Sequence, residues 1–149
     1  MQLIVNDVIN QIKEIAKKNQ SRESSQKTRF VTEDKIKVGE CFRQGDLYIW
    51  KVEINHPVGE EIVRNQLADG ISLGARHVLN GDFKIYKGIK SPFNFSNVHI
   101  RAGALGYAFD ASETTVLGHP EHDNFVFKSQ CRWQVTHQID SRTLQRVGD

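Results

Sequence analysis

The sequence predicts a mainly β fold: a single compact barrel or sandwich domain preceded by an N-terminal amphipathic α-helix. Two patterns predict it, a helical apolar repeat at the start of the chain and a later series of short alternating segments separated by glycines. The length of 149 residues fits one domain and is enough to bury one hydrophobic core.

Residues 1–18 are expected to form the helix. Apolar residues recur at three- and four-residue spacing from Leu3 to Ala16, and Asn19 fits the end of the helix. The apolar face must be covered, either by the rest of the domain, which we favour, or by the same helix of a second subunit. A homo-oligomer built through this helix is therefore one expected partner arrangement. Residues 19–35 have almost no apolar content and are predicted to be a polar linker.

Residues 36–149 are predicted to be the β-rich domain. Its glycines fall mainly between the predicted strands, as turns require. Asn80-Gly81-Asp82 predicts a hairpin between the strands on either side of it, and residues 60–67 fit a short helix. The predicted strands are Leu47 to Ile54, His77 to Leu79, Phe83 to Tyr86, Val98 to Ile100, Gly106 to Phe109, Thr114 to Leu117, Phe125 to Phe127 and Arg132 to Ile139.

Composition and charge exclude several classes. With 38% hydrophobic and 26% charged residues, the chain contains no run of about 18 apolar residues and no secretory signal, so we expect a cytoplasmic protein without a membrane partner. A net charge of +2 is too small to indicate nucleic-acid binding. The basic segment from Lys13 to Lys37 is read as solvated surface, and nucleic acid stays a weak alternative. Cys41 and Cys131 form no CxxC pair and are expected to be free, buried thiols.

The chemistry is concentrated in Leu117-Gly118-His119-Pro120-Glu121-His122-Asp123. Two imidazoles and two carboxylates within seven residues supply the groups that a transition metal or an acid–base site needs. Pro120 after Gly118 argues against a continuing helix, so we predict a tight turn at the end of the preceding strand. Such a turn can direct both rings at one ion.

Two ligands rarely hold a metal ion, and His77 is the residue we choose as the third. It follows a glycine-punctuated approach to a strand, where a side chain can be displayed at the end of a sheet. The predicted metal ligands are thus His77, His119 and His122, and the metal is Zn, Fe, Mn or Ni. The opposing interpretation is a polar surface turn whose side chains cap backbone groups.

Glu121 and Asp123 are the candidate catalytic residues. Either carboxylate can supply an oxygen ligand, orient an imidazole or act as the general base for a bound water. His56, His99 and His137 are weaker candidates, because they lie in a turn or in strand-like runs. The chain has no P-loop, dinucleotide fingerprint, GxSxG elbow or HExxH motif, so no nucleotide cofactor is expected.

Several ordered motifs resemble a group of small bacterial and phage proteins of unassigned biochemical function. Members open with an Arg-Gln-Gly-Asp phrase, continue with Gly-x-x-x-Gly-His-x-His and Thr-His-x-Glu-His elements, and finish with Arg-Val-x-Asp. The matching positions cover about residues 43–149. They are Arg43-Gln44-Gly45-Asp46, then Gly70, Gly74 and His77, then His119, Glu121 and His122, then Trp133, Val135 and Gln138, and finally Arg146, Val147 and Asp149.

The resemblance implies a shared site at His77, His119 and His122 and transfers no activity. The chain departs from the pattern at Ala75, where the group has its first histidine, and at Gly118, where it has threonine. A site that needed both early histidines would lack a ligand here.

The function we expect is a small cytoplasmic protein with a His/carboxylate metal site, with metal-assisted hydrolysis as the reaction class. In that reaction the ion lowers the pKa of a bound water and Glu121 accepts its proton. Two alternatives stay open: a non-catalytic module that binds protein or nucleic acid, and a homo-oligomeric structural protein assembled through the first helix.

Overall fold

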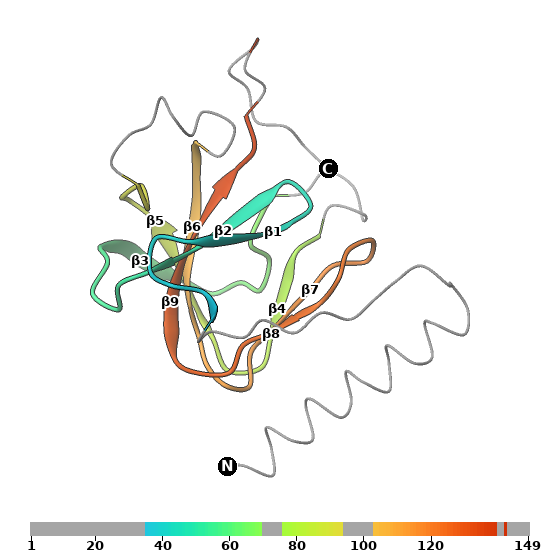
Figure 1. The fold of residues 1–149 in the computed structure, drawn as a ribbon. Coiled ribbons are helices and arrows are strands. Elements are labelled where there is room, and N and C mark those ends of the chain that lie inside the picture. Colours follow the sequence, from blue (N-terminus) through green and yellow to red (C-terminus); the bar gives the residue numbers. More distant parts are fainter. Residues whose placement is uncertain (1–34, 70–75, 94–102, 140–141, 143–149) are drawn as a thin grey trace.

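The structure is a computed structural model that describes residues 35–69, 76–93, 103–139 and 142. Within these ranges the chain forms nine strands in two antiparallel sheets (Figure 1). This confirms the mainly β prediction, and the two sheets do not close into one hydrogen-bonded barrel. The helix predicted at 1–18, the linker up to residue 34 and the strand predicted at Val98 to Ile100 lie outside the described residues.

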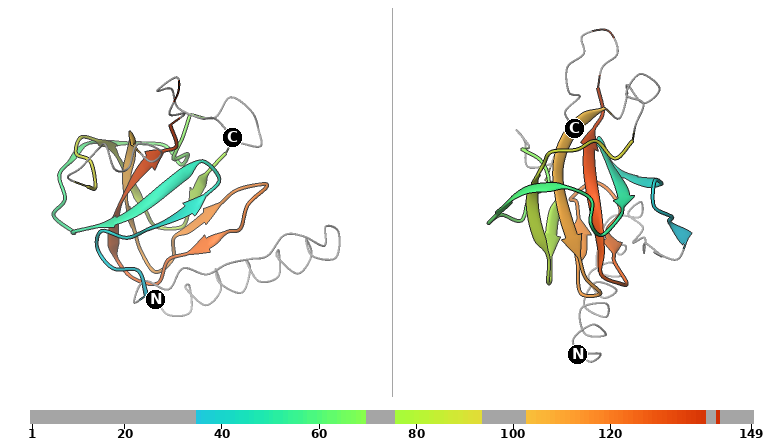
Figure 2. Two further views of the ribbon diagram at one scale, coloured as in Figure 1. Left: turned by 45° about the horizontal axis from the view of Figure 1, so that its top comes forward. Right: turned by 90° about the vertical axis from the view of Figure 1, so that its left-hand side faces the viewer.

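The larger sheet has six strands in the order β1-β2-β9-β6-β5-β3, and the smaller has three in the order β4-β7-β8. Figure 2 shows both from two further sides. In chain order the strands are β1 (Cys41–Gln44), β2 (Leu47–Val52), β3 (Val58–Ile62), β4 (Val78–Asn80), β5 (Lys84–Gly88), β6 (Ala104–Ala111), β7 (Val116–Gly118), β8 (Phe125–Val126) and β9 (Cys131–His137).

The hydrophobic core lies between the sheets, because apolar side chains from both belong to one buried cluster. Alternation along β9 places Trp133 and Val135 on the inner face. Aromatic rings fill much of the space: the ring centroids of Phe42 and Phe125 are 4.3 Å apart, and those of Phe127 and Trp133 are 5.3 Å apart. This packing fixes how the two sheets sit against each other.

The prediction of a short helix over 60–67 was wrong. The segment begins in strand β3, which pairs with β5 at the edge of the sheet. Side chains of opposite charge on the two strands form ion pairs. Glu60 is 2.6 Å from Lys87, and Glu61 is 4.0 Å from Lys84. Cross-strand pairing of this kind decides between strand and helix where the apolar spacing fits both.

The predicted hairpin at Asn80-Gly81-Asp82 was also wrong, although the strands beside it were located well. Asn80 pairs with Val116 in the small sheet, whereas Lys84 pairs with Asp110 in the large one. The turn therefore carries the chain from one sheet to the other. Gly81 has φ of 91°, and a Cβ there would collide with the carbonyl oxygen of Thr114.

Cys41 and Cys131 are free, as expected, but they are half-buried instead of buried. Cys41 lies on the edge strand β1, and Cys131 begins β9. Burial raises the pKa of the Cys41 thiol, and the charge of Glu40 adds to this while Arg43 opposes it.

Gly81→Ala is expected to destabilise the fold more than Gly39→Ala. Both glycines have nearly the same positive φ, 91° and 93°, so each alanine costs about 1–2 kcal/mol of backbone strain. Only at Gly81 does the new Cβ meet another backbone group, since nothing lies within 4 Å of the position at Gly39. Urea unfolding should show at least about 1 kcal/mol of additional loss for Gly81→Ala. Equal losses would show that the contact with Thr114 does not constrain the turn.

Candidate functional site

The register of the small sheet brings His77 and His119 together. Strands β4 and β7 are antiparallel and Val78 pairs with Gly118, so one step beyond this pair His77 lies opposite His119. The centroids of the two imidazole rings are 4.4 Å apart. His77 and His119 are far apart in the sequence, and the pairing of β4 with β7 makes them neighbours.

The turn from β7 to β8 adds the third ring. The ring centroids of His119 and His122 are also 4.4 Å apart. The turn folds back on itself, because the Glu121 N–H donates to His119 Nδ1 at 3.0 Å and the His119 N–H donates to Asn124 Oδ1 at 3.3 Å. We call His77, His119 and His122 the histidine row. It runs from the fully buried His77 to the half-buried His122.

Gln44 holds His77 from the large sheet. Its Nε2 donates to the carbonyl oxygens of Asp123 and Leu117, at 2.8 and 3.4 Å, which turns the amide oxygen toward the imidazole. His77 Nδ1 lies 2.8 Å from that oxygen. Since an amide oxygen only accepts hydrogen bonds, Nδ1 must carry a hydrogen.

The second nitrogen of His77 faces Asp46. Nε2 is 3.2 Å from Asp46 Oδ1, and the side chains are 0% and 4% exposed. Burial alone would raise the pKa of Asp46, but the hydrogen bond and charge of His77, a backbone N–H and the charge of His137 together lower it. Nε2 of His77 and the Asp46 carboxylate thus form a buried polar pair that joins the two sheets.

The structure thus places the three predicted histidines in one row and both predicted carboxylates beside it. Glu121 is exposed and Asp123 half-buried, and they hold the turn through backbone groups: the Glu121 N–H and the Asp123 carbonyl. In the part of the chain that the structure describes, no three side chains of metal-binding type stand close enough together to hold an ion. The metal site stays a prediction.

Sequence reasoning missed Gln44 and Asp46 as members of the site. The available signal was the Arg43-Gln44-Gly45-Asp46 phrase, which carried the resemblance but was given no role. Among the weaker candidates, His56 lies apart, with Nε2 3.1 Å from the carbonyl oxygen of Lys90. His137 is buried at the end of β9, and His99 lies outside the described residues.

Comparison of the chain with known protein families, curated proteins and solved structures finds no match. No helix among the described residues is long and apolar enough to span a membrane.

Asp46→Asn is expected to lower the free energy of unfolding by about 1–3 kcal/mol at pH 7, because it removes the buried negative charge that faces Nε2 of His77. The pKa of Asp46 is lowered in the folded chain, so its charge stabilises the fold above the unfolded pKa of about 3.9. That contribution is lost as the pH falls through the folded value. Urea unfolding should therefore show a gap between wild type and variant that narrows from pH 7 toward about pH 3.

The control for this experiment is Asp82→Asn, which removes an exposed carboxylate from the turn between the sheets. It should show no such gap at either pH. A gap for Asp46→Asn that is the same at both pH values would contradict a stabilising negative charge at Asp46.

Proposed function

We propose that the histidine row binds a divalent transition metal ion, with His119 and His122 as ligands and His77 as the third. The observation that carries the proposal is the pair of successive ring-centroid distances of 4.4 Å. Two imidazoles on one ion, each with a metal–nitrogen distance of about 2.1 Å, have ring centres roughly 5 Å apart. The row is close to that spacing and needs side-chain rotation, with no change of fold, to converge on one ion.

The hydrogen bonds of the row indicate which nitrogens the ion would take. His119 Nδ1 offers its lone pair to the Glu121 N–H, and an ion can take that lone pair in place of the amide. His77 must release one of its two partners. The neutral amide of Gln44 holds it less strongly than the charged Asp46, so Nδ1 is the nitrogen to be freed. Nδ1 would give up its proton to solvent as the ion binds.

The contact of Asp46 with Nε2 of His77 also supports the proposal. An imidazole that binds a metal usually donates its other N–H to a carboxylate or carbonyl, which orients the ring and makes it a better ligand. The contact between His77 and Asp46 already has this form, and it is buried. In the proposed site Asp46 orients His77 and does not touch the ion.

Metal-assisted hydrolysis is the reaction class we propose for a loaded site. A bound ion would lower the pKa of a water molecule, and a carboxylate on the same turn would accept its proton. Glu121 is the better placed base because it is exposed, next to His122. Asp123 lies on the other side of His122 and is the second candidate.

Tag-free protein is expected to carry close to one Zn, Fe, Mn or Ni ion per chain by elemental analysis. His119→Ala and His122→Ala should lose most of it, and a chelator should lower the Tm of the wild type only. At a free-ion concentration of 100 times Kd, binding adds about 2.7 kcal/mol of stability. His56→Ala is the matched control, since this ring lies on the Lys90 carbonyl and away from the row. The proposal would be refuted if the purified protein contains no metal and its Tm does not change when metal is added.

Glu121→Gln should keep the metal and lose hydrolysis. Replacing a general base typically costs about 10² to 10⁴ in rate, whereas the neutral amide leaves the backbone N–H on His119 intact. Turnover of p-nitrophenyl acetate and bis(p-nitrophenyl) phosphate by metal-loaded protein measures this. Equal rates in wild type and variant, or no turnover beyond that of the free ion, would contradict the hydrolytic role. The metal content of the protein tests metal binding separately.

A further inference from the structure

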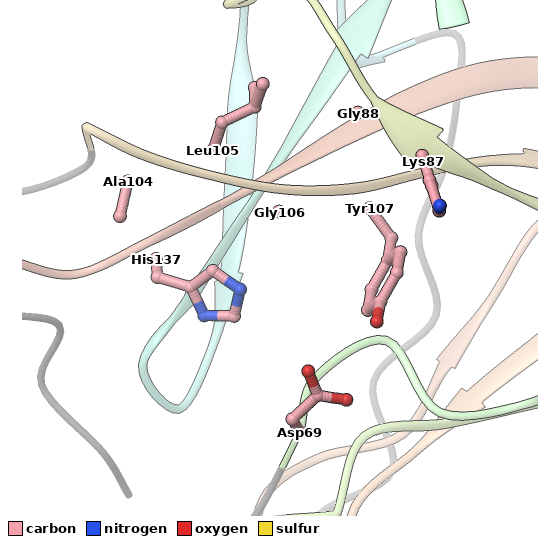
Figure 3. A pocket seen from close by; sticks show the side chains of 8 residues that line it. All are labelled: Asp69, Lys87, Gly88, Ala104, Leu105, Gly106, Tyr107 and His137. Atoms are coloured by element: carbon pink, nitrogen blue, oxygen red, sulfur yellow. The ribbon is translucent and has the colours of Figure 1, made fainter. Parts of the chain in front are cut away.

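A second site lies at the end of the large sheet, apart from the histidine row. It is a cavity of about 430 Å³ between the ends of β5, β6 and β9 and the segment that contains Asp69 (Figure 3). Its polar lining comes mainly from the side chains of Asp69, Lys87, Tyr107 and His137. This volume is in the range of pockets that hold small molecules.

A β-bulge builds one wall of the cavity. The pairing of β6 with β9 shifts between Leu105 and Ala108, so Gly106 and Tyr107 together lie opposite Val135. The buried Gln134 holds the bulge by donating from Nε2 to the carbonyl oxygens of Gly106 and Tyr107, at 2.9 and 3.2 Å. Without the extra residue, alternation would turn Tyr107 to the other face of the sheet. Bulges that redirect a side chain in this way are common beside binding sites.

Arg64 fixes the two groups that face the cavity. Its Nη1 donates to the Tyr107 hydroxyl oxygen at 2.6 Å, and its Nη2 lies 3.0 Å from Asp69 Oδ1. Nε donates to the carbonyl oxygen of Gln66, which anchors the guanidinium to the backbone. Two neighbouring nitrogens of one rigid group therefore hold a phenol and a carboxylate side by side, and Figure 3 shows both directed into the same space.

The remaining hydrogen-bonding capacity of these two groups is complementary. The Tyr107 oxygen accepts from Arg64, so its own hydrogen is available to donate. Asp69 gives one oxygen to Arg64 and keeps acceptor capacity on the carboxylate. The wall thus presents a donor next to an acceptor. A ligand fits it when it has an acceptor next to a donor on one planar edge, as cyclic amides and amidines do.

We propose that this cavity binds the nucleobase of a free nucleoside through that edge. The two nearest fixed charges already have counter-charges, since Asp69 is paired with Arg64 and Lys87 with Glu60 at 2.6 Å. An uncharged ring therefore fits better than an ion. The rings of Tyr107 and His137 flank the space, and the half-buried ring of Tyr107 offers aromatic surface to a flat ligand. The proposal does not depend on metal at the histidine row.

The test is titration of the full chain with uridine and with guanosine, in which calorimetry or ligand-observed NMR measures binding. Both nucleosides should bind, and 3-methyluridine, which has lost its N–H donor, should bind at least about fivefold more weakly than uridine. Tyr107→Phe and Asp69→Ala should each weaken uridine by at least about fivefold, because each removes one of the two hydrogen bonds.

Tyr86→Phe is the matched control. Tyr86 lies on the neighbouring strand β5, and its hydroxyl donates to Asp110 at 3.0 Å, outside the cavity lining. This variant should bind uridine as the wild type does. An unchanged Tm in all three variants shows that they are folded.

Three results would overturn the proposal. The first is that neither nucleoside binds the wild type. The second is that Tyr107→Phe and Tyr86→Phe bind uridine equally well. The third is that a short single-stranded oligonucleotide binds although no free nucleoside does. The last result would assign the surface to nucleic acid instead of a free nucleoside.

Discussion

The buried contact between Asp46 and His77 ties the two sheets together at the end of the molecule where the candidate site lies. Asp46 lies in the turn between β1 and β2 of the large sheet, and His77 precedes β4 of the small one. A pair of this kind adds little net stability compared with apolar residues, but losing one partner is costly. The effect of the pair is therefore to fix the position of His77, which Gln44 also holds. The next two rings of the histidine row lie beside it, with planes tilted by 46° and 42° from one ring to the next.

Asp46 also connects the histidine row with the cavity beyond it. The charge of His137 contributes to lowering the pKa of Asp46, and His137 lines the cavity at the end of β9. His137 pairs with Leu47, the residue after Asp46. Asp46 therefore lies between the first ring of the histidine row and a side chain that lines the cavity.

Part of this arrangement was predictable from sequence. Alternation and glycine spacing located seven of the strands that the structure describes, and Gly118 with Pro120 placed His119 and His122 in a turn after a strand. The choice of His77 as their partner rested on its place at the start of a strand. The register of β4 and β7 brings these rings together.

The rest depends on tertiary partners that local patterns do not contain. Turn chemistry at Gly81 could not reveal that its flanking strands join different sheets. Strand β3 was missed because its apolar spacing also fits a helix, and its strand form depends on pairing with β5, which lies more than twenty residues further along the chain. The polar side chains of Gln44 and Asp46 can be buried because each contacts a ring nitrogen of His77, about thirty residues away in sequence. The bulge that turns Tyr107 inward likewise depends on Gln134 of a distant strand.

The most direct test of the metal site is a crystal structure of tag-free protein grown with zinc, with anomalous data collected at the zinc absorption edge. We predict one strong peak about 2.1 Å from one ring nitrogen of each of His77, His119 and His122. In that structure His77 has left Gln44 and still contacts Asp46. A histidine row without a peak, in which His77 keeps both partners, would contradict metal binding at this site.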